Sequence, residues 1–519
     1  MAIREGNPRI TVQYDAHGQL GVPFDEWLDF RFSFIDQPGS QIDAIIWDIG
    51  WGSWASYPST VLPRFEHPGL NLWWEQGIEW VGELVRATNE RGLRCLWNHR
   101  VSEVDINPLP DVGQDTELMM DHLNPVKAAH PDWVIKTWWW QGLWNYAVPE
   151  VREYQLAILR ELALQYDLDG FQIDFARHMP VLPIGRQWEL REGVTEFMRM
   201  MRGMLAEVGA QRGRPFELGA RLSNTLDGCR ADGLDVWAWA QERLVDFLTL
   251  GTRSMSVEVE KFREVMGPGV RLQPCFDDHH ATDGYRFQPV EFLRGVFSNW
   301  LTQGANGVTT FNWPNASPDL SNEIVLKRWG RGIFGESHLP SHEQAYREGG
   351  SLETMRGQDK VFAVERRGGY PWAEGYLNRN DDAPLPAPLR HDGTPAGLAV
   401  RLCDLPGASG AVTLRLVLFG AREGDEITAS LDGEPLPRTL CDHQWHDPQL
   451  FSPAPQPPSG GSGEYQINPD QRLTRLECAV PVHLCREGPN VFAVAVASRL
   501  PYCNDEIVVE KLEVHVRYE

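Results

Sequence analysis

Short apolar runs and longer periodic segments alternate along residues 40–315. The short runs predict buried strands, and the segments whose apolar residues recur every three or four positions predict amphipathic helices. Eight strands that alternate with helices favour a closed (β/α)8 TIM barrel over an open doubly wound sheet. The strands are expected at 42–49, 93–98, 134–137, within 168–178, and at 216–222, 245–250, 270–276 and 307–311.

The helices of this barrel are expected between those strands, at 73–90, 150–166, 187–211, 235–243, 257–266 and 289–303. Residues 1–40 contain a polar start followed by the aromatic-rich segment FDEWLDFRFSFID. We expect that segment to form a helix that packs beneath the barrel.

Beyond about residue 340 the pattern changes to short alternating segments such as VTLRLVLFG, DEITASLDGEPL, NVFAVAVAS and IVVEKLEVHVRYE. Alternation of this kind, interrupted by turn residues, is typical of an antiparallel β-sandwich. In texture the segment is similar to jelly-roll or galactose-binding-like accessory domains. The fold class expected is therefore α/β. Residues 1–340 would form the barrel with an N-terminal extension, and residues 341–519 would form an accessory β-sandwich.

Charge and composition narrow the range of partners. A net charge of −24 and a pI near 5.1 disfavour binding to nucleic acid or to an anionic membrane surface. The sequence contains neither a signal segment nor a long apolar run, so a cytoplasmic protein is expected. The eight cysteines form no CxxC pair, so at most one disulfide is expected, in the C-terminal tail. The sequence leaves open whether the protein forms a homo-oligomer. No glycine-rich phosphate motif follows a strand, so no cofactor is expected.

The 21 tryptophans are concentrated in the barrel region, where 19 of them occur at or before Trp329. Indole rings stack well on sugar rings, although many will be core residues. The run of three at 138–140 suits a wall or lid that stacks on a sugar, and packing against the preceding polar segment is an equally good interpretation. The chain is therefore expected to bind a carbohydrate.

Polar side chains follow the predicted strands at their carboxyl ends, which in a parallel barrel form the catalytic face. Glycosidic cleavage needs two carboxylates from different strands. Asp174 with Asp278 or Asp277 is the expected catalytic pair, one as acid and the other as nucleophile or base; only one of the adjacent Asp277 and Asp278 should face the substrate. The substrate-binding residues expected are Asp48, Trp51, Asn98, His99, Trp138, Trp139, Trp140, Arg177, His178, Arg221, His279, Asn312 and Trp313.

Two other chemistries are compatible with polar residues at strand ends. Asp and His side chains could bind zinc and activate water, but the sequence has no His-x-His on the first strand and no HExxH helix, so no metal ligand is assigned. A Ser-His-Asp site is disfavoured because no GxSxG motif occurs.

The segment DGFQIDFARH, residues 169–178, resembles the strand-four motif of the alpha-amylase-like glycoside hydrolases, G-F-R-x-D-x-x-K-H. Gly170, Phe171, Asp174 and His178 match, and Arg177 occupies the lysine position. WNH at 97–99 is similar to an earlier signature of that family, and FDDHH at 276–280 to a later one. The resemblance implies that Asp174 is the nucleophile of a glycoside hydrolase.

This chain departs from the amylase pattern at two places. Gln172 replaces the arginine that holds the nucleophile, and FELGARLSN offers no glutamate where the family has its acid. The segment also begins like the chitinase-type motif D-G-x-D-x-D-x-E. Gln172 and Ala176, however, replace the inner aspartate and the catalytic glutamate of that motif. Over residues 40–315 the pattern looks most like poorly characterised bacterial glycoside-hydrolase-like barrel proteins.

The sequence thus predicts a glycoside hydrolase that cleaves an oligo- or polysaccharide with retention of configuration. Its motifs do not identify the sugar. The alternatives are a metal-dependent hydrolase on the same barrel and a carbohydrate-binding barrel without catalytic activity.

Overall fold

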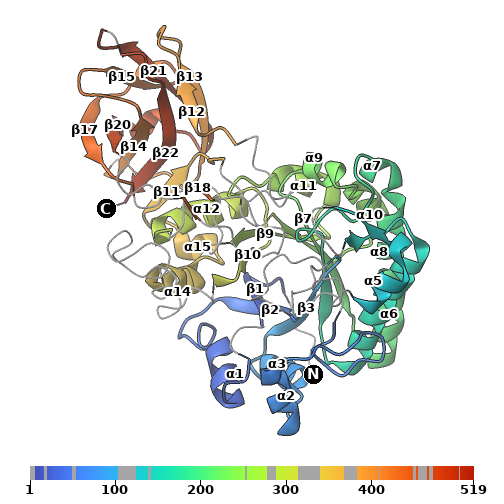
Figure 1. Cartoon of the computed structure of the whole chain (residues 1–519). Coiled ribbons are helices and arrows are strands. Elements are labelled where there is room, and N and C mark those ends of the chain that lie inside the picture. The colour runs from blue at the N-terminus through green and yellow to red at the C-terminus, as the bar shows by residue number, and fades with distance from the viewer. Residues whose placement is uncertain are drawn as a thin grey trace.

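The computed structural model describes residues 6–16, 20–49, 54–102, 124–137, 142–251, 254–277, 288–313, 339–367, 383–407, 409–447, 452–453, 465–466, 472–501 and 503–518. Within them the chain forms an α/β barrel followed by an antiparallel sandwich, which occupy the lower and upper parts of Figure 1. Both halves of the predicted fold class are confirmed.

Eight parallel strands close into a barrel in the order β1-β10-β9-β8-β7-β6-β3-β2. Their bounds are β1 (Ile10–Asp15), β2 (Ile42–Asp48), β3 (Arg94–Arg100), β6 (Gly170–Asp174), β7 (Glu217–Leu222), β8 (Phe247–Leu250), β9 (Arg271–Asp277) and β10 (Val308–Phe311). Each strand is almost entirely buried, as expected for a parallel sheet covered by helices.

The predicted barrel strand at 134–137 is wrong. Val134–Ile135 is β4, which pairs antiparallel with β5 (Leu143–Trp144) outside the barrel. The missing barrel strand is β1, in the segment taken for a polar start. The apolar residues of β1 face the helices, and Thr11, Gln13 and Asp15, which alternate with them, face the barrel interior. The sequence of β1 therefore has the pattern of a half-exposed strand, although both of its faces are largely buried.

Helices cover the barrel on its outside (Figure 1). Their bounds are α1 (Phe24–Phe32), α2 (Pro68–Glu75), α3 (Trp80–Glu90), α5 (Pro125–Ala129), α6 (Pro149–Gln165), α7 (Gln187–Leu190), α8 (Glu192–Arg212), α9 (Leu226–Ala231), α10 (Val236–Glu242), α11 (Val259–Met266), α12 (Val290–Thr302), α14 (Leu339–Glu348) and α15 (Leu352–Met355). The aromatic-rich segment near the N-terminus forms α1, as predicted. The single helix predicted at 73–90 is two, with Gly77 at φ 79° between them.

The barrel interior has an apolar lower layer and a polar upper part. Ile46, Leu96 and Phe247 form a small apolar cluster. Closer to the carboxyl ends of the barrel strands, the inward positions carry buried polar residues, among them Gln172 and Thr249. Buried polar groups of this kind must be hydrogen-bonded to one another, and that requirement organises the candidate site.

Two antiparallel sheets form the sandwich, with β11-β22-β14-β20-β17 and β12 in one and β13-β21-β15-β16 in the other. The bounds are β11 (Lys360–Ala363), β12 (Ala387–Leu389), β13 (Ala396–Leu402), β14 (Ala411–Phe419), β15 (Glu426–Leu431), β16 (Glu434–Pro435), β17 (Arg438–Trp445), β20 (Leu473–Val480), β21 (Gly488–Ser498) and β22 (Ile507–Arg517). A further pair, β18 (Ser452–Pro453) and β19 (Tyr465–Gln466), lies outside both sheets. Inward residues of both sheets share one apolar core, as alternation predicts.

The sandwich is joined to the barrel through α12, which packs on β11. A Cβ atom at Gly295 would lie 2.1 Å from the carbonyl oxygen of Val361, so the helix and the strand approach as closely as a glycine permits. The division predicted at residue 340 stays a prediction; Ala345, Tyr346 and Met355 belong to the apolar core of the barrel.

All eight cysteines are free thiols, so the disulfide considered for the tail is not formed. Within the described ranges, no helix is both long and apolar enough to cross a membrane.

Candidate active site

The candidate site lies inside the barrel at the carboxyl ends of its strands. Alternation along each strand turns Asp48, Asn98, Asp174 and Arg221 inward, while their neighbours face the helices. All four side chains are buried. The strands β2, β3, β6 and β7 that carry them are consecutive neighbours in the barrel, so four residues predicted from separate strands meet in one cluster.

Asp174, the last residue of β6, is fully buried and accepts hydrogen bonds at both oxygens. Its Oδ1 accepts from the backbone N–H of Ala176 at 2.9 Å. Its Oδ2 accepts from Asn98 Nδ2 at 2.9 Å, Arg221 Nη1 at 3.3 Å and Gln13 Nε2 at 3.4 Å. Four donors converge on a carboxylate that is fully buried.

These donors decide the protonation state of Asp174. Burial raises the pKa of its carboxyl, but the charge of Arg221, the Asn98 hydrogen bond, the charge of Arg100 and the Ala176 N–H together lower it, and the net pKa is below the ordinary value of 3.8. Asp174 is therefore ionised at neutral pH, which a nucleophile requires.

A chain of polar contacts extends from Asp174 to the rim of the barrel. Asn98 Nδ2 also donates to Asp48 Oδ2 at 2.9 Å, and Arg100 Nη2 lies 2.6 Å from that same oxygen. Arg100 Nη2 is also 2.6 Å from Asp15 Oδ1. Asp15 in turn forms two hydrogen bonds with Asn312, whose Nδ2 donates to Asp15 Oδ2 at 2.7 Å. Arg100 thus joins two carboxylates of the site.

Asp15 was not foreseen because β1 was not recognised as a strand. A signal was present: in ITVQYD the apolar residues alternate with polar ones, and the segment ends on a carboxylate. Arg100 was placed beyond the end of its strand, but it is the last residue of β3 and its side chain is turned inward, toward Asp15 and Asp48.

Asp277 is the last residue of β9 and is fully buried. Cys275 lies two residues earlier on the same strand, and its thiol is affected by the charges nearby. Burial raises the pKa of this thiol to about 12. The charge of Arg221 lowers that pKa, and the charges of Asp277 and Asp174 raise it. Arg221 also lies over the ring of Phe311, 4.4 Å from its centroid. Both predicted carboxylates therefore act on the same region of the barrel.

Arg177 and His178 lie three and four residues beyond the end of β6. His178 has a left-handed backbone conformation, with φ at 60°, and its side chain is buried. Burial, together with the charges of Arg177, Arg100 and Lys127, holds the pKa of His178 well below its usual range. His178 is therefore neutral, so it can serve as a hydrogen-bonding group beside the site without adding charge.

Two residues predicted to bind substrate lie away from this cluster. His99 faces the helix layer, where its Nε2 is 2.9 Å from Gln155 Oε1 on α6; burial lowers its pKa to about 4, against the weaker raising effects of Gln155 and Asp174. Trp313 donates from Nε1 to the carbonyl of Phe276 at 3.1 Å and stacks on His342 with centroids 4.3 Å apart. Neither side chain is joined to Asp174 or Asp48 by a described contact.

The remaining predicted residues lie outside the described part of the chain. They are Trp51, Trp138, Trp139, Trp140, Asp278 and His279. Among the residues that are described, no group of three or more His, Cys, Asp or Glu side chains is arranged to hold a metal ion.

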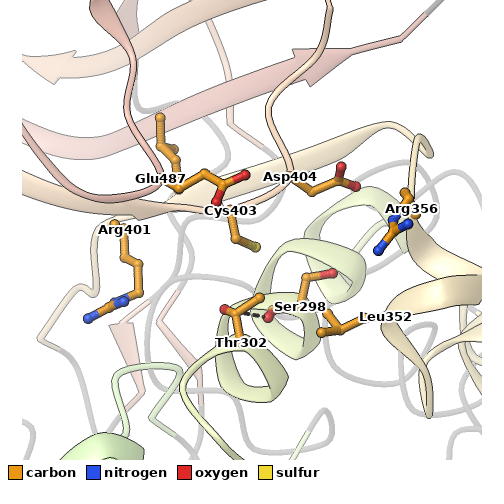
Figure 2. A pocket seen from close by; sticks show the side chains of 10 residues that line it. Ser298, Thr302, Leu352, Arg356, Arg401, Cys403, Asp404 and Glu487 are labelled. Carbon is orange, nitrogen blue, oxygen red and sulfur yellow. Dashed lines mark hydrogen bonds between the residues drawn. The ribbon is translucent and has the colours of Figure 1, made fainter.

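Two of the cavities lined by described residues lie where the barrel meets the sandwich. One has a volume of about 370 Å³ and is lined by Ser298 and Thr302 of α12 together with Cys403 and Asp404 that follow β13. Figure 2 shows Cys403 above the α12 residues, with Arg356 and Arg401 on opposite sides. The other, of about 270 Å³, is lined in part by Val296 of α12 and Val361 of β11. Neither includes a residue of the barrel cluster.

No family model and no curated protein sequence matches this chain. Among solved structures, it resembles the alpha-L-fucosidase isoenzyme 2 from Paenibacillus thiaminolyticus, with 14% identity and a TM-score of 0.41 over 69% of this chain and 52% of that chain. It also resembles a GH36 alpha-galactosidase from Geobacillus stearothermophilus, with 11% identity and a TM-score of 0.36 over 92% of this chain and 56% of that chain.

A third similar structure is the PgaB glycoside hydrolase domain from Bordetella bronchiseptica, with 12% identity and a TM-score of 0.38 over 66% of this chain and 98% of that chain. This chain spans about half the length of the first two structures.

Proposed function

We propose that this protein is a glycoside hydrolase that cleaves an oligo- or polysaccharide with retention of configuration. The observation that carries the proposal is the ionised carboxylate of Asp174, buried at the carboxyl end of the fourth barrel strand and held by Arg221, Asn98 and the Ala176 N–H. A buried charge that is kept ionised by several donors at the catalytic end of a barrel is suited to nucleophilic attack.

The two oxygens of Asp174 have different roles in this mechanism. Oδ2 accepts three side-chain hydrogen bonds, whereas Oδ1 accepts one, from Ala176, among the described residues. Oδ1 is therefore the oxygen that attacks the anomeric carbon, while the donors on Oδ2 hold the carboxylate in position. The attack forms a glycosyl ester and breaks the bond to the leaving oxygen.

Asp277 serves as the acid/base in the proposal. It protonates the leaving oxygen in the first step, and in the second it removes a proton from the water that hydrolyses the ester. Asp278, its neighbour in sequence, is the alternative assignment. Asp48 is less suited to this role because Arg100 lies 2.6 Å from its Oδ2, and an ion pair of that kind favours the unprotonated carboxylate.

The rim residues would bind the sugar. The side chain of Asp15 is 29% exposed, in contrast to the fully buried Asp48, and is held rigidly by Arg100 and Asn312. A fixed carboxylate at the rim can accept hydrogen bonds from sugar hydroxyl groups. Arg177 and His178 would contribute donors from the loop after β6.

The experiment is a screen of aryl glycosides and oligosaccharides with the purified protein and with Asp174→Asn. We expect the variant to lose activity by about 10⁴-fold, because the nucleophile is removed while the shape is kept. Asp232→Asn serves as the control, because Asp232 is also a buried carboxylate but follows α9, outside the barrel cluster. Undiminished activity in Asp174→Asn would refute the assignment.

The anomeric form of the first product, followed by NMR, tests retention. For Asp277→Ala, we expect aryl glycosides with a good leaving group to be cleaved much faster than alkyl glycosides, since only the latter need protonation. Binding of an oligosaccharide without cleavage would favour the non-catalytic alternative. Loss of activity in a chelator, restored by a divalent ion, would favour metal-dependent hydrolysis.

A further inference from the structure

Below Asp174, the barrel interior contains a connected set of side-chain amides. Thr249 Oγ1 on β8 donates to Gln172 Oε1 at 2.6 Å. Gln172 Nε2 then donates to two carbonyl oxygens, Asn98 Oδ1 at 2.7 Å and Gln13 Oε1 at 3.0 Å. The amide groups of Asn98 and Gln13 in turn both donate to Asp174 Oδ2. Hydrogen bonds thus run in one direction, from Thr249 to Asp174.

The direction of these hydrogen bonds is determined by the chemistry of the amide group, which has a donor on one side and an acceptor on the other. If Gln172 were reversed, its Oε1 would face the carbonyl oxygens of Asn98 and Gln13. Those two amides would then have to reverse and present oxygens to the carboxylate of Asp174. Each reversal would bring like partial charges together inside the barrel, where little water is present to screen them.

We propose that Gln172, held by Thr249, is a positioning residue that orients the amides of Asn98 and Gln13 so that both donate to Asp174. Gln172 occupies the position at which the resembled amylase motif has an arginine. In this chain Arg221 on β7 places a positive charge beside Asp174, and the described hydrogen bonds link Gln172 to Asp174 through two other side chains. Its catalytic consequence rests on the proposed function, whereas its effect on Asp174 does not.

The barrel offers a matched control for this proposal. Gln273 on β9 is also a buried inward glutamine, 2% exposed against 0% for Gln172. Its Nε2 donates to Thr11 Oγ1 at 2.9 Å and to the carbonyl of Pro8 at 3.4 Å, and no described hydrogen bond joins it to Asp174. Replacing either glutamine by methionine removes a buried amide group and keeps nearly the same side-chain size.

The test compares Gln172→Met with Gln273→Met by titrating Asp174 in protein carrying ¹³C-labelled aspartate, with the Asp174 signal identified from its absence in Asp174→Asn. We expect the titration midpoint of Asp174 to rise by about one pH unit in Gln172→Met, because the two amides lose their orientation. It should stay within the error of wild type in Gln273→Met. Equal midpoints in the two variants would overturn the proposal.

Thr249→Val is the second variant, because it removes only the hydroxyl that holds Gln172 and keeps the side-chain shape. We expect a smaller shift in the same direction, and an unchanged midpoint would show that Thr249 has no part in the orientation. If a glycoside substrate is found, the acid limb of kcat/KM should move with the NMR midpoint. If none is found, the proposed function fails and the NMR comparison still decides the role of Gln172.

Discussion

Arg221 Nη1 lies 3.3 Å from Asp174 Oδ2, and both side chains are fully buried. The strand that carries Asp174 supplies no cationic partner of its own, since Gln172 stands two residues before the carboxylate. The structure supplies the guanidinium from β7, the strand next to β6 in the barrel. A function that the linear motif lacks is thus provided by a residue 47 positions later in the chain.

Removing Arg221 should destabilise the protein strongly. Arg221→Met leaves the carboxylate of Asp174 buried without its cationic partner, which costs about 3–5 kcal/mol. Urea denaturation at pH 7 measures the loss. The double variant Arg221→Met with Asp174→Asn should recover part of it, because the uncompensated charge is gone. A double variant less stable than the single one would contradict this account.

The depressed pKa of Asp174 predicts a particular pH dependence. A carboxyl whose pKa is lower in the folded state contributes stability that is present above its unfolded value, near 3.8, and is lost as pH falls through the folded value. In Asp174→Asn that contribution is absent. Its urea midpoint should therefore fall less steeply than that of wild type below about pH 4. Parallel curves for the two proteins would argue against an ionised Asp174.

The lowered pKa of His99 predicts a second change of stability with pH, in a different pH range. Its pKa is about 4 in the folded protein, against an ordinary value of 6.5, because burial disfavours the charged ring. The unfolded chain takes up a proton first, so stability is complete above pH 6.5 and falls as pH decreases toward 4, by about 3 kcal/mol in all. His99→Gln should show a flatter curve in this range. An unchanged slope would mean that other groups cause the decline.

The contact between α12 and β11 can be tested with one methyl group. In Gly295→Ala the new Cβ would meet the Val361 carbonyl oxygen at 2.1 Å, so the helix and strand must separate, at a cost of about 1–3 kcal/mol. Calorimetry should show a lower unfolding temperature.

Gly203→Ala is the matched control for that substitution. Gly203 lies within α8 and has nothing within 4 Å of an added Cβ. Alanine should stabilise the helix there by about 1 kcal/mol. If both variants were destabilised equally, the close approach at Gly295 would not be the cause.

Periodicity was sufficient to predict most of the barrel because buried parallel strands and amphipathic helices differ in the spacing of their apolar residues. It failed at β1, where inward residues are polar, and at 134–137, where an apolar pair belongs to a hairpin outside the barrel. The two errors compensated, so β6 is the fourth barrel strand along the chain, as predicted, and Asp174 lies at its end.

By itself the sequence determined that Asp48, Asn98, Asp174, Arg221 and Asp277 lie at strand ends, because strand ends can be read from local pattern. Only the tertiary structure decided which of these residues touch, and that Asp15, Arg100, Gln13 and Gln172 join them. The physical reason is that closure of the barrel brings side chains from strands far apart in sequence into one largely buried space. There each buried polar group must find its partner on another strand.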